Sequence, residues 1–148
     1  MAHLQYEEGT VLVPTFSITD LAAGEVEVGS SVGGADNMPW CDIRVTVDPT
    51  AAPAVNNVLL DVYFIETVDG VEEDTDVNAD AEGYFSPDAY VGSVVANDSA
   101  DHTAKDYIIR AVRMPVGAFK PAVQNRDSTA LGAAVTMDIQ PWSLELSA

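Results

Sequence analysis

The segment from Trp40 to Asp48 has the sharpest alternation in the sequence, since from Cys41 onward apolar and polar residues follow one another without a break. The apolar positions of this run are Cys41, Ile43, Val45 and Val47. Successive side chains of a β-strand point to opposite faces, so the pattern predicts a strand with one core face and one solvent face. No amphipathic helical period longer than about two turns occurs in the sequence, and we therefore expect an all-β protein.

Seven more segments have the composition of strands, because each is rich in alternating, β-branched or aromatic residues and is bounded by turn-forming residues. They are residues 10–19, 24–29, 57–68, 90–96, 107–114, 119–124 and 133–139. The segment 57–68 differs from the others because it is apolar on both faces. We expect it to lie in the centre of a sheet or at an interface.

Eight strands with turn signals between them fit an antiparallel two-sheet β-sandwich. Eight is the strand count of a jelly roll, although an immunoglobulin-like arrangement or a small barrel predicts much the same periodicity. A chain of 148 residues is one domain by the usual size range, and it can bury a core without disulfides or metal. We expect residues 1–148 to form a single β-sandwich domain with a long, exposed acidic loop at about 69–88.

The charge balance limits the partners of the chain. It has 24 Asp and Glu residues against 6 Lys and Arg residues, a formal net charge of -18. Nucleic-acid binding needs cationic side chains that face phosphates, so we expect no DNA or RNA partner. The acidity fits either a soluble, self-repelling surface or a match to a basic partner. The first interpretation is the simpler, because net charge bears on solubility before it bears on recognition.

Cys41 is the only cysteine, so no intramolecular disulfide can form. It follows Trp40 in an apolar alternation, and we expect it to be a small buried hydrophobic residue. The sequence shows neither a signal-peptide pattern nor an apolar run of membrane-spanning length. We therefore expect a protein that is neither exported by the usual signal nor embedded in a membrane.

The residues needed for catalysis or metal binding are sparse. His3 and His102 are the only histidines, and neither is expected beside a nucleophile or in a zinc ligand set. From Asp74 to Gly83, oxygen-bearing residues recur at every second position, as in a calcium loop. Ala79 and Phe85, however, replace the glycine and the bidentate glutamate of an EF-hand. We expect no enzyme activity, no cofactor and no metal. We interpret this segment as a solvated acidic loop, with a non-standard calcium site as the less favoured alternative.

Five of the six cations lie in the C-terminal part of the chain. They are Lys105, Arg110, Arg113, Lys120 and Arg126. In the simpler interpretation each is a cross-strand partner of a neighbouring acid. In the functional interpretation, Arg110, Arg113, Lys120 and Arg126, together with Trp142 of the apolar tail, mark an interface with an acidic neighbour such as another copy of the chain.

Residues 108–134 read IIRAVRMPVGAFKPAVQNRDSTALGAA. An Ile-Arg-Ala segment, a Pro/Gly turn, a Phe-Lys strand, an Asn-containing turn and an Ala-Leu stretch follow one another in this order. The order resembles that of the C-terminal half of small structural proteins of tailed bacteriophages, with Pro121 inside the Phe-Lys strand as a departure.

This resemblance implies a non-enzymatic virion structural protein with a jelly-roll β-sandwich. The implied role is that of a capsid decoration, cement or minor capsid protein on the capsid surface, present in the host cytoplasm during assembly. Its implied partners are the major capsid protein and sibling subunits, with a homotrimer favoured. A second hypothesis is a carbohydrate- or receptor-binding β-sandwich. Trp40, Trp142 or Tyr84 exposed on a flat face would favour it, and their burial would count against it.

Overall fold

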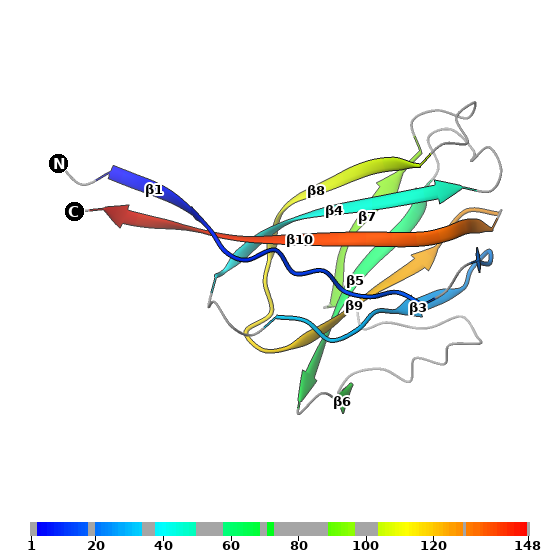
Figure 1. Ribbon diagram of the computed structural model, residues 1–148, viewed down its shortest axis with the longest axis horizontal. Helices are drawn as coiled ribbons and strands as arrows, with labels where there is room; N and C mark the ends of the chain where they lie inside the picture. The colour runs from blue at the N-terminus through cyan, green and yellow to red at the C-terminus, as the bar shows by residue number, and fades with distance from the viewer. Residues whose placement is uncertain are drawn as a thin grey trace.

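The computed structural model describes residues 3–17, 20–33, 38–49, 58–68, 71–72, 89–96, 104–128 and 130–147, and these residues contain no α-helix. Two antiparallel sheets pack face to face, as the sequence predicts (Figure 1). The strands are β1 (His3–Glu8), β2 (Asp20–Leu21), β3 (Val26–Val28), β4 (Trp40–Pro49), β5 (Val58–Val68), β6 (Val71–Glu72), β7 (Tyr90–Val95), β8 (Lys105–Arg113), β9 (Phe119–Asn125) and β10 (Leu131–Ser147).

The strand order identifies the connectivity. One sheet has the order β1-β10-β4-β8, with β2 also paired to β10, and we call it sheet A. The other, sheet B, has the order β3-β9-β5, with β7 and β6 both paired to the far side of β5. Apart from the two-residue strands β2 and β6, eight strands remain in the described part of the chain, and among these only β5 and β7 follow each other within one sheet. This is the eight-stranded jelly roll, so the fold predicted from the sequence is confirmed.

The core lies between the two sheets. The alternation of residues 40–48 is confirmed, because Cys41, Ile43, Val45 and Val47 are all fully buried. They meet the inward side chains of sheet B and of β10. These are Leu60, Val62, Phe64, Phe119, Val123, Met137 and Ile139. Burial of such side chains is the main stabilising contribution in a sandwich of this size.

The strand β5 is central, as its two apolar faces predict, since β9 pairs with one side of it and β7 with the other. Leu59 belongs to the core cluster, and Ile65, which lies outside that cluster, is also buried. The excess apolar face of β5 is therefore covered within the chain. The sequence-based alternative, an interface with another chain at this strand, is not needed to explain it.

The predicted first strand, residues 10–19, is wrong. The first strand is instead β1, and in the described residues 9–17 only Leu12 forms a bridge, to Ile139 of β10. Pro14 interrupts this segment, and the residues that follow it form hydrogen bonds to β3 of sheet B and to the residues just after β3. Thr15 exchanges hydrogen bonds with Ser30, and the Glu27 carboxylate accepts one from the Ser17 amide. These contacts replace a regular strand ladder.

The predicted last strand, residues 133–139, is too short, because β10 continues through Pro141 to Ser147. Proline has no amide hydrogen to donate to the facing strand. The Pro141 carbonyl still accepts from the Gly9 amide at 2.9 Å, and the missing donor is replaced by a side chain. Gln140 Nε2 donates to the Gly9 carbonyl at 2.8 Å. The strand therefore passes the proline without leaving an unpaired carbonyl.

A two-stranded ribbon projects from the sandwich. It consists of β1 and the C-terminal end of β10, residues 142–147, and we call it the arm. Figure 1 shows both chain ends at the tip of the arm, beyond the end of the two sheets. The register pairs Leu4 with Leu146 and Tyr6 with Leu144. His3, expected near a frayed terminus, is instead paired in this ribbon with Ser147.

Candidate functional site

Three aromatic side chains lie in a row across the outer face of sheet A, at the base of the arm. Tyr6 of β1 lies 5.6 Å from Trp142 of β10, measured between ring centroids. Trp142 lies 6.1 Å from Trp40 of β4, with the two rings inclined by 22°. We call these three residues the aromatic row. Tyr6 and Trp40 are exposed and Trp142 is half-buried, so the row presents apolar surface to solvent.

Asp42 fixes the central indole of the aromatic row. Its carboxylate accepts a hydrogen bond from Trp142 Nε1 at 3.2 Å and another from the Ala111 amide at 2.9 Å. The same carboxylate forms an ion pair with Arg110 at 3.1 Å. A single carboxylate thus connects the aromatic row to the edge strand β8.

A β-bulge in β8 creates this arrangement. The register places Cys41 opposite Val112 and Ile43 opposite Ile109, so Arg110 and Ala111 together face Asp42. Ala111 has φ = 55°, a left-handed conformation that L-residues adopt only at an energetic cost. The bulge aims both Arg110 and the Ala111 amide at the Asp42 carboxylate.

The apolar surface continues from the aromatic row along one side of the arm. Directly paired residues of an antiparallel ribbon share a face, so this side carries Leu4, Tyr6, Leu144 and Leu146. Their exposed fractions are 66%, 51%, 54% and 73%. We call these four side chains the arm face. The opposite side of the arm carries polar residues such as Gln5, Glu7 and Glu145.

A groove lies at the open edge of the sandwich, where β8 of sheet A faces β7 of sheet B. Its volume is about 1010 Å³. The strands β5, β7 and β8, Trp40 and the turn after β8 line it. Its apolar walls include Val91, Ile109, Val112 and Met114, which also pack against the core. Arg110, Arg113 and Glu66 supply charge, and we call this feature the edge groove.

The structure separates the residues predicted to form an interface. Arg110, Arg113 and Trp142 lie together on sheet A, where Arg113 is paired in register with Trp40, next to Trp142. Lys120 and Arg126 belong instead to the strand β9 of sheet B and the turn after it. The five residues therefore mark two regions of the surface.

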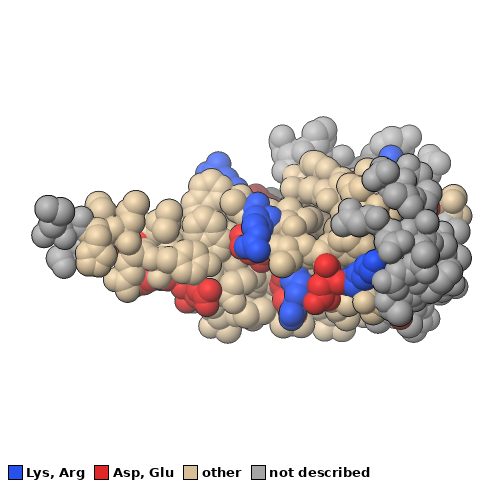
Figure 2. Space-filling view, turned by 90° about the horizontal axis from the view of Figure 1, so that it is seen from above, with Lys and Arg blue, Asp and Glu red and all other residues tan. Residues whose placement is uncertain are grey.

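Several cations are cross-strand partners of acids, as the simpler interpretation of the sequence proposes. Arg110 pairs with Asp42, and Arg126 Nε lies 3.4 Å from Asp61 Oδ2. Arg44 forms an ion pair with Asp138, its register partner, and this raises the pKa of the Arg44 guanidinium. Figure 2 shows such blue and red side chains next to one another on the body.

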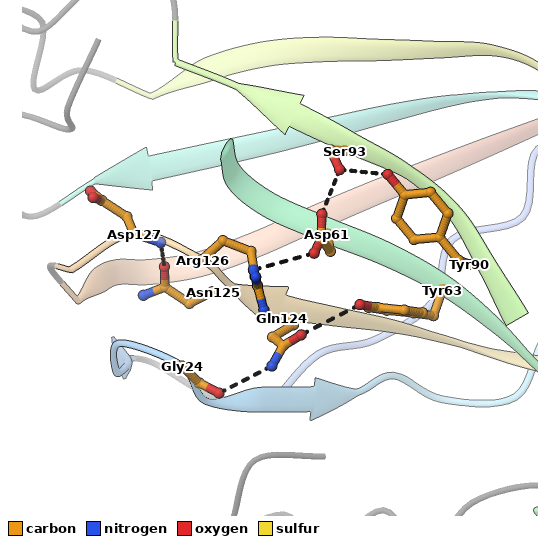
Figure 3. Close-up of polar contacts among 9 residues, drawn as sticks. All are labelled: Gly24, Asp61, Tyr63, Tyr90, Ser93, Gln124, Asn125, Arg126 and Asp127. Carbon is orange, nitrogen blue, oxygen red and sulfur yellow. Dashed lines mark hydrogen bonds and ion pairs between the residues drawn. The ribbon is translucent and has the colours of Figure 1, made fainter. Parts of the chain in front are cut away.

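A polar network lies on sheet B (Figure 3). Asp61 of β5 accepts a hydrogen bond from the Ser93 hydroxyl and forms the ion pair with Arg126. The Ser93 hydroxyl is also 2.6 Å from the Tyr90 hydroxyl. Beyond Asp61, the Tyr63 hydroxyl donates to Gln124 at 3.4 Å. The polar groups of this network are paired with one another, so it connects β5, β7 and β9.

Tyr63 is the titratable group of this network whose pKa is shifted. Burial raises the pKa of its phenol, and the negative charge of Asp61 adds to the effect. The ring lies 5.8 Å from that of Tyr90 in an edge-to-face arrangement. The phenol is therefore held as a neutral hydrogen-bond donor over the ordinary pH range.

The described residues show no group of three or more His, Cys, Asp or Glu side chains that could hold a metal ion. In the same part of the chain no helix is long and apolar enough to cross a membrane. Other sequence-based predictions concern residues that lie outside those described. They are Tyr84, His102, the calcium-like segment 74–83 and most of the acidic loop at 69–88.

No known family model matches the chain, and no curated protein matches it. Among solved structures, it has a distant likeness to TmCBM61 in complex with beta-1,4-galactotriose. The two are 8% identical over 97% of this chain and 88% of the other, with a TM-score of 0.28. A likeness at this level carries no argument about function.

Sequence reasoning named Trp142 but missed its neighbours Tyr6 and Asp42. Tyr6 belongs to a strand that was not predicted, and the pairing of the chain ends depends on strand order, which one sequence does not reveal. The signal for the arm was nonetheless present. Leu4 and Tyr6 alternate with polar residues, as do Trp142, Leu144 and Leu146. Each end of the sequence therefore has the pattern of a strand with one apolar side.

Proposed function

We propose that this chain is a non-enzymatic virion structural protein of a tailed bacteriophage, a capsid decoration, cement or minor capsid protein. In this proposal it binds the major capsid protein lattice at the capsid surface and is present in the host cytoplasm during assembly. It forms a homo-oligomer, with a trimer favoured. The bacteriophage part of the proposal rests on the sequence resemblance of residues 108–134.

The observation that carries the proposal is the continuous apolar surface formed by the arm face and the aromatic row. Large exposed apolar patches on a small protein mark surfaces that bind other macromolecules. Trp, Tyr and Arg are the residues that contribute most to protein interfaces, and Trp40, Tyr6 and Arg113 lie on or beside this surface. The jelly roll itself recurs in viral capsid domains, which is a supporting analogy of fold only.

The test is co-sedimentation with capsids assembled from the major capsid protein of the same phage. The double variant Leu4→Ser with Leu146→Ser should lose attachment. As a matched control, Val13→Ser with Ile108→Ser changes two similarly exposed apolar side chains off the arm and should attach like the unchanged protein. Equal attachment by all three proteins would contradict the use of the arm face, and no attachment by any of them would contradict the capsid proposal.

A second set of variants tests the orientation of the protein on the capsid. In our proposal the acidic residues after β5 face solvent, because many buried carboxylates would each need a partner. Replacing Glu72, Glu73 and Asp74 by serine should leave attachment almost unchanged. Arg113→Ala, beside Trp40, should weaken it. The reverse pattern would show that the orientation is backwards.

A carbohydrate- or receptor-binding role is the second candidate, and the aromatic row is the observation that favours it. Exposed aromatic rings beside fixed polar groups suit stacking on a sugar, and Trp40 and Trp142 lie beside Asp42. A glycan-array signal that Trp40→Ala abolishes would support this role. The Leu4→Ser and Leu146→Ser double variant should retain such a signal, because a sugar would stack on the aromatic row and would not need the aliphatic side chains of the arm face.

A further inference from the structure

The arm is amphipathic and projects away from its own sandwich. An isolated two-stranded ribbon is marginally stable in water, and an apolar side is normally buried against another layer. The described residues provide no such layer over Leu4 and Leu146, which are 66% and 73% exposed. The arm face is therefore a surface in need of a partner.

The edge groove has the size and lining of a surface that could receive the arm face. At about 1010 Å³ it lies at the upper end of the range for ligand pockets, so it can accept several side chains. Its walls are half-buried aliphatic residues that continue the core, among them Val91, Val112 and Met114. No residue of the arm lines the groove of its own chain.

The arm is acidic, whereas the groove is lined by two arginines, Arg110 and Arg113, and one acid, Glu66. The arm carries Glu7, Glu8 and Glu145 and has no lysine or arginine. The groove carries Arg113, which has no ion-pair partner among the described residues, whereas Arg44, Arg110 and Arg126 each have one. Glu8 shares the side of the arm face, because it is paired with Trp142, and is therefore placed to meet such a guanidinium, whereas Glu7 and Glu145 lie on the opposite side.

We propose that the arm of one copy docks with its arm face in the edge groove of a second copy, where Arg113 meets Glu8 of the arm. The contact joins two different surfaces of the same chain. Such a contact closes either into a ring or, when two arms are exchanged reciprocally, into a dimer. This inference deepens the homo-oligomer part of the proposed function and rests on it, but it does not require the capsid.

The test uses the purified full chain and two variants. The arm variant is Leu4→Ser with Leu146→Ser, and the groove variant is Arg113→Glu. Sedimentation velocity at micromolar concentration should show an oligomer for the unchanged chain and monomers for each variant alone. The control, Val13→Ser with Ile108→Ser, should form the same oligomer as the unchanged chain. Far-ultraviolet circular dichroism and thermal unfolding check that each protein is folded.

The decisive measurement is the mixture of the two variants. The arm variant keeps an intact groove and the groove variant keeps an intact arm, so the mixture should form a complex with one restored contact. A groove variant that self-associates like the unchanged chain, or a mixture that stays monomeric, would overturn the arm-in-groove contact. A monomeric unchanged chain would also overturn it. The unchanged chain separates the two proposals, since its oligomeric state and its co-sedimentation with capsids are measured independently. Loss of attachment by the arm variant alone does not separate them, because both tests change the same arm face.

Discussion

The carboxylate of Asp42 accepts a hydrogen bond from the backbone amide of Ala111 at 2.9 Å, and this contact holds the bulge of β8 against β4. Bulges bend an edge strand and interrupt its regular row of amide and carbonyl groups, which protects the edge from pairing with other chains. Asp42 also bonds to the Trp142 indole, so the shape of the edge and the position of the aromatic row depend on the same side chain.

We expect Asp42→Ala to lower the free energy of unfolding by about 1 to 2 kcal/mol, because the Ala111 amide and the Trp142 indole both lose their acceptor. Urea unfolding measures this change. Asp138→Ala is the matched control, since it removes a half-buried cross-strand carboxylate that is paired with the exposed Arg44 and should cost about 0 to 1 kcal/mol. Equal losses in the two variants would mean that Asp42 contributes no more than an ordinary surface ion pair.

The left-handed conformation of Ala111 leads to a second prediction. Glycine adopts positive φ without the steric cost that alanine incurs. Ala111→Gly should therefore leave stability unchanged or raise it by up to about 1 kcal/mol. Ala104→Gly, at an exposed position just before β8, should lower stability instead, because there glycine only adds freedom to the unfolded chain. A clear loss in Ala111→Gly would contradict the strained bulge.

Much of the fold could be predicted from residue order because period-two alternation depends only on which side chains are buried. Residues 40–48 and 119–124 were therefore placed within a residue or two of β4 and β9. The predicted last strand stopped at residue 139, whereas β10 continues through Pro141 because Gln140 supplies the donor that proline lacks. This hydrogen bond joins Gln140 to Gly9, which is far away in sequence, so no local sequence pattern predicts it.

The candidate site was less predictable, since it depends on which strands are neighbours. The cluster of Arg110, Arg113 and Trp142 requires β8, β4 and β10 to be adjacent in sheet A. The bulge at Ala111 was not predicted, because alanine carries no signal for a positive φ. Once register places two residues opposite Asp42, that conformation follows from geometry.

The glycine positions near the core give a third prediction. Gly33 has φ = 90°, and a Cβ there would lie 2.6 Å from Phe119 Cε1. Gly24 has a similar φ of 78°, but a Cβ there would meet nothing within 4 Å. Gly24→Ala should therefore cost about 1 to 2 kcal/mol for the backbone alone. Gly33→Ala should cost clearly more, because the buried Phe119 ring must also shift. Equal costs from urea unfolding would show that the loop moves away from Phe119 freely.

The last prediction concerns alkaline pH and Cys41. Burial raises the pKa of the Cys41 thiol from 9.0 to about 12, and the negative charge of Asp42 adds to the effect. Below pH 9 the thiol is protonated in both the folded and the unfolded chain, so its contribution to stability is fully present there. Between pH 9 and about 12 the thiol ionises only in the unfolded chain. The unfolded state then binds fewer protons, and stability falls as pH rises, by up to about 1.4 kcal/mol per pH unit.

Cys41→Ala isolates this contribution from that of the tyrosines and lysines, which titrate in the same range. The variant is less stable than the unchanged chain at about pH 8 because a buried sulfur is lost, and this difference should shrink steadily between about pH 9 and pH 11. A thiol-specific reagent gives an independent check, since the thiolate is the reactive form and the buried thiol should react only in urea. A stability difference that stays constant over this pH range, or a thiol that reacts in the folded protein, would mean that solvent reaches Cys41 between the sheets.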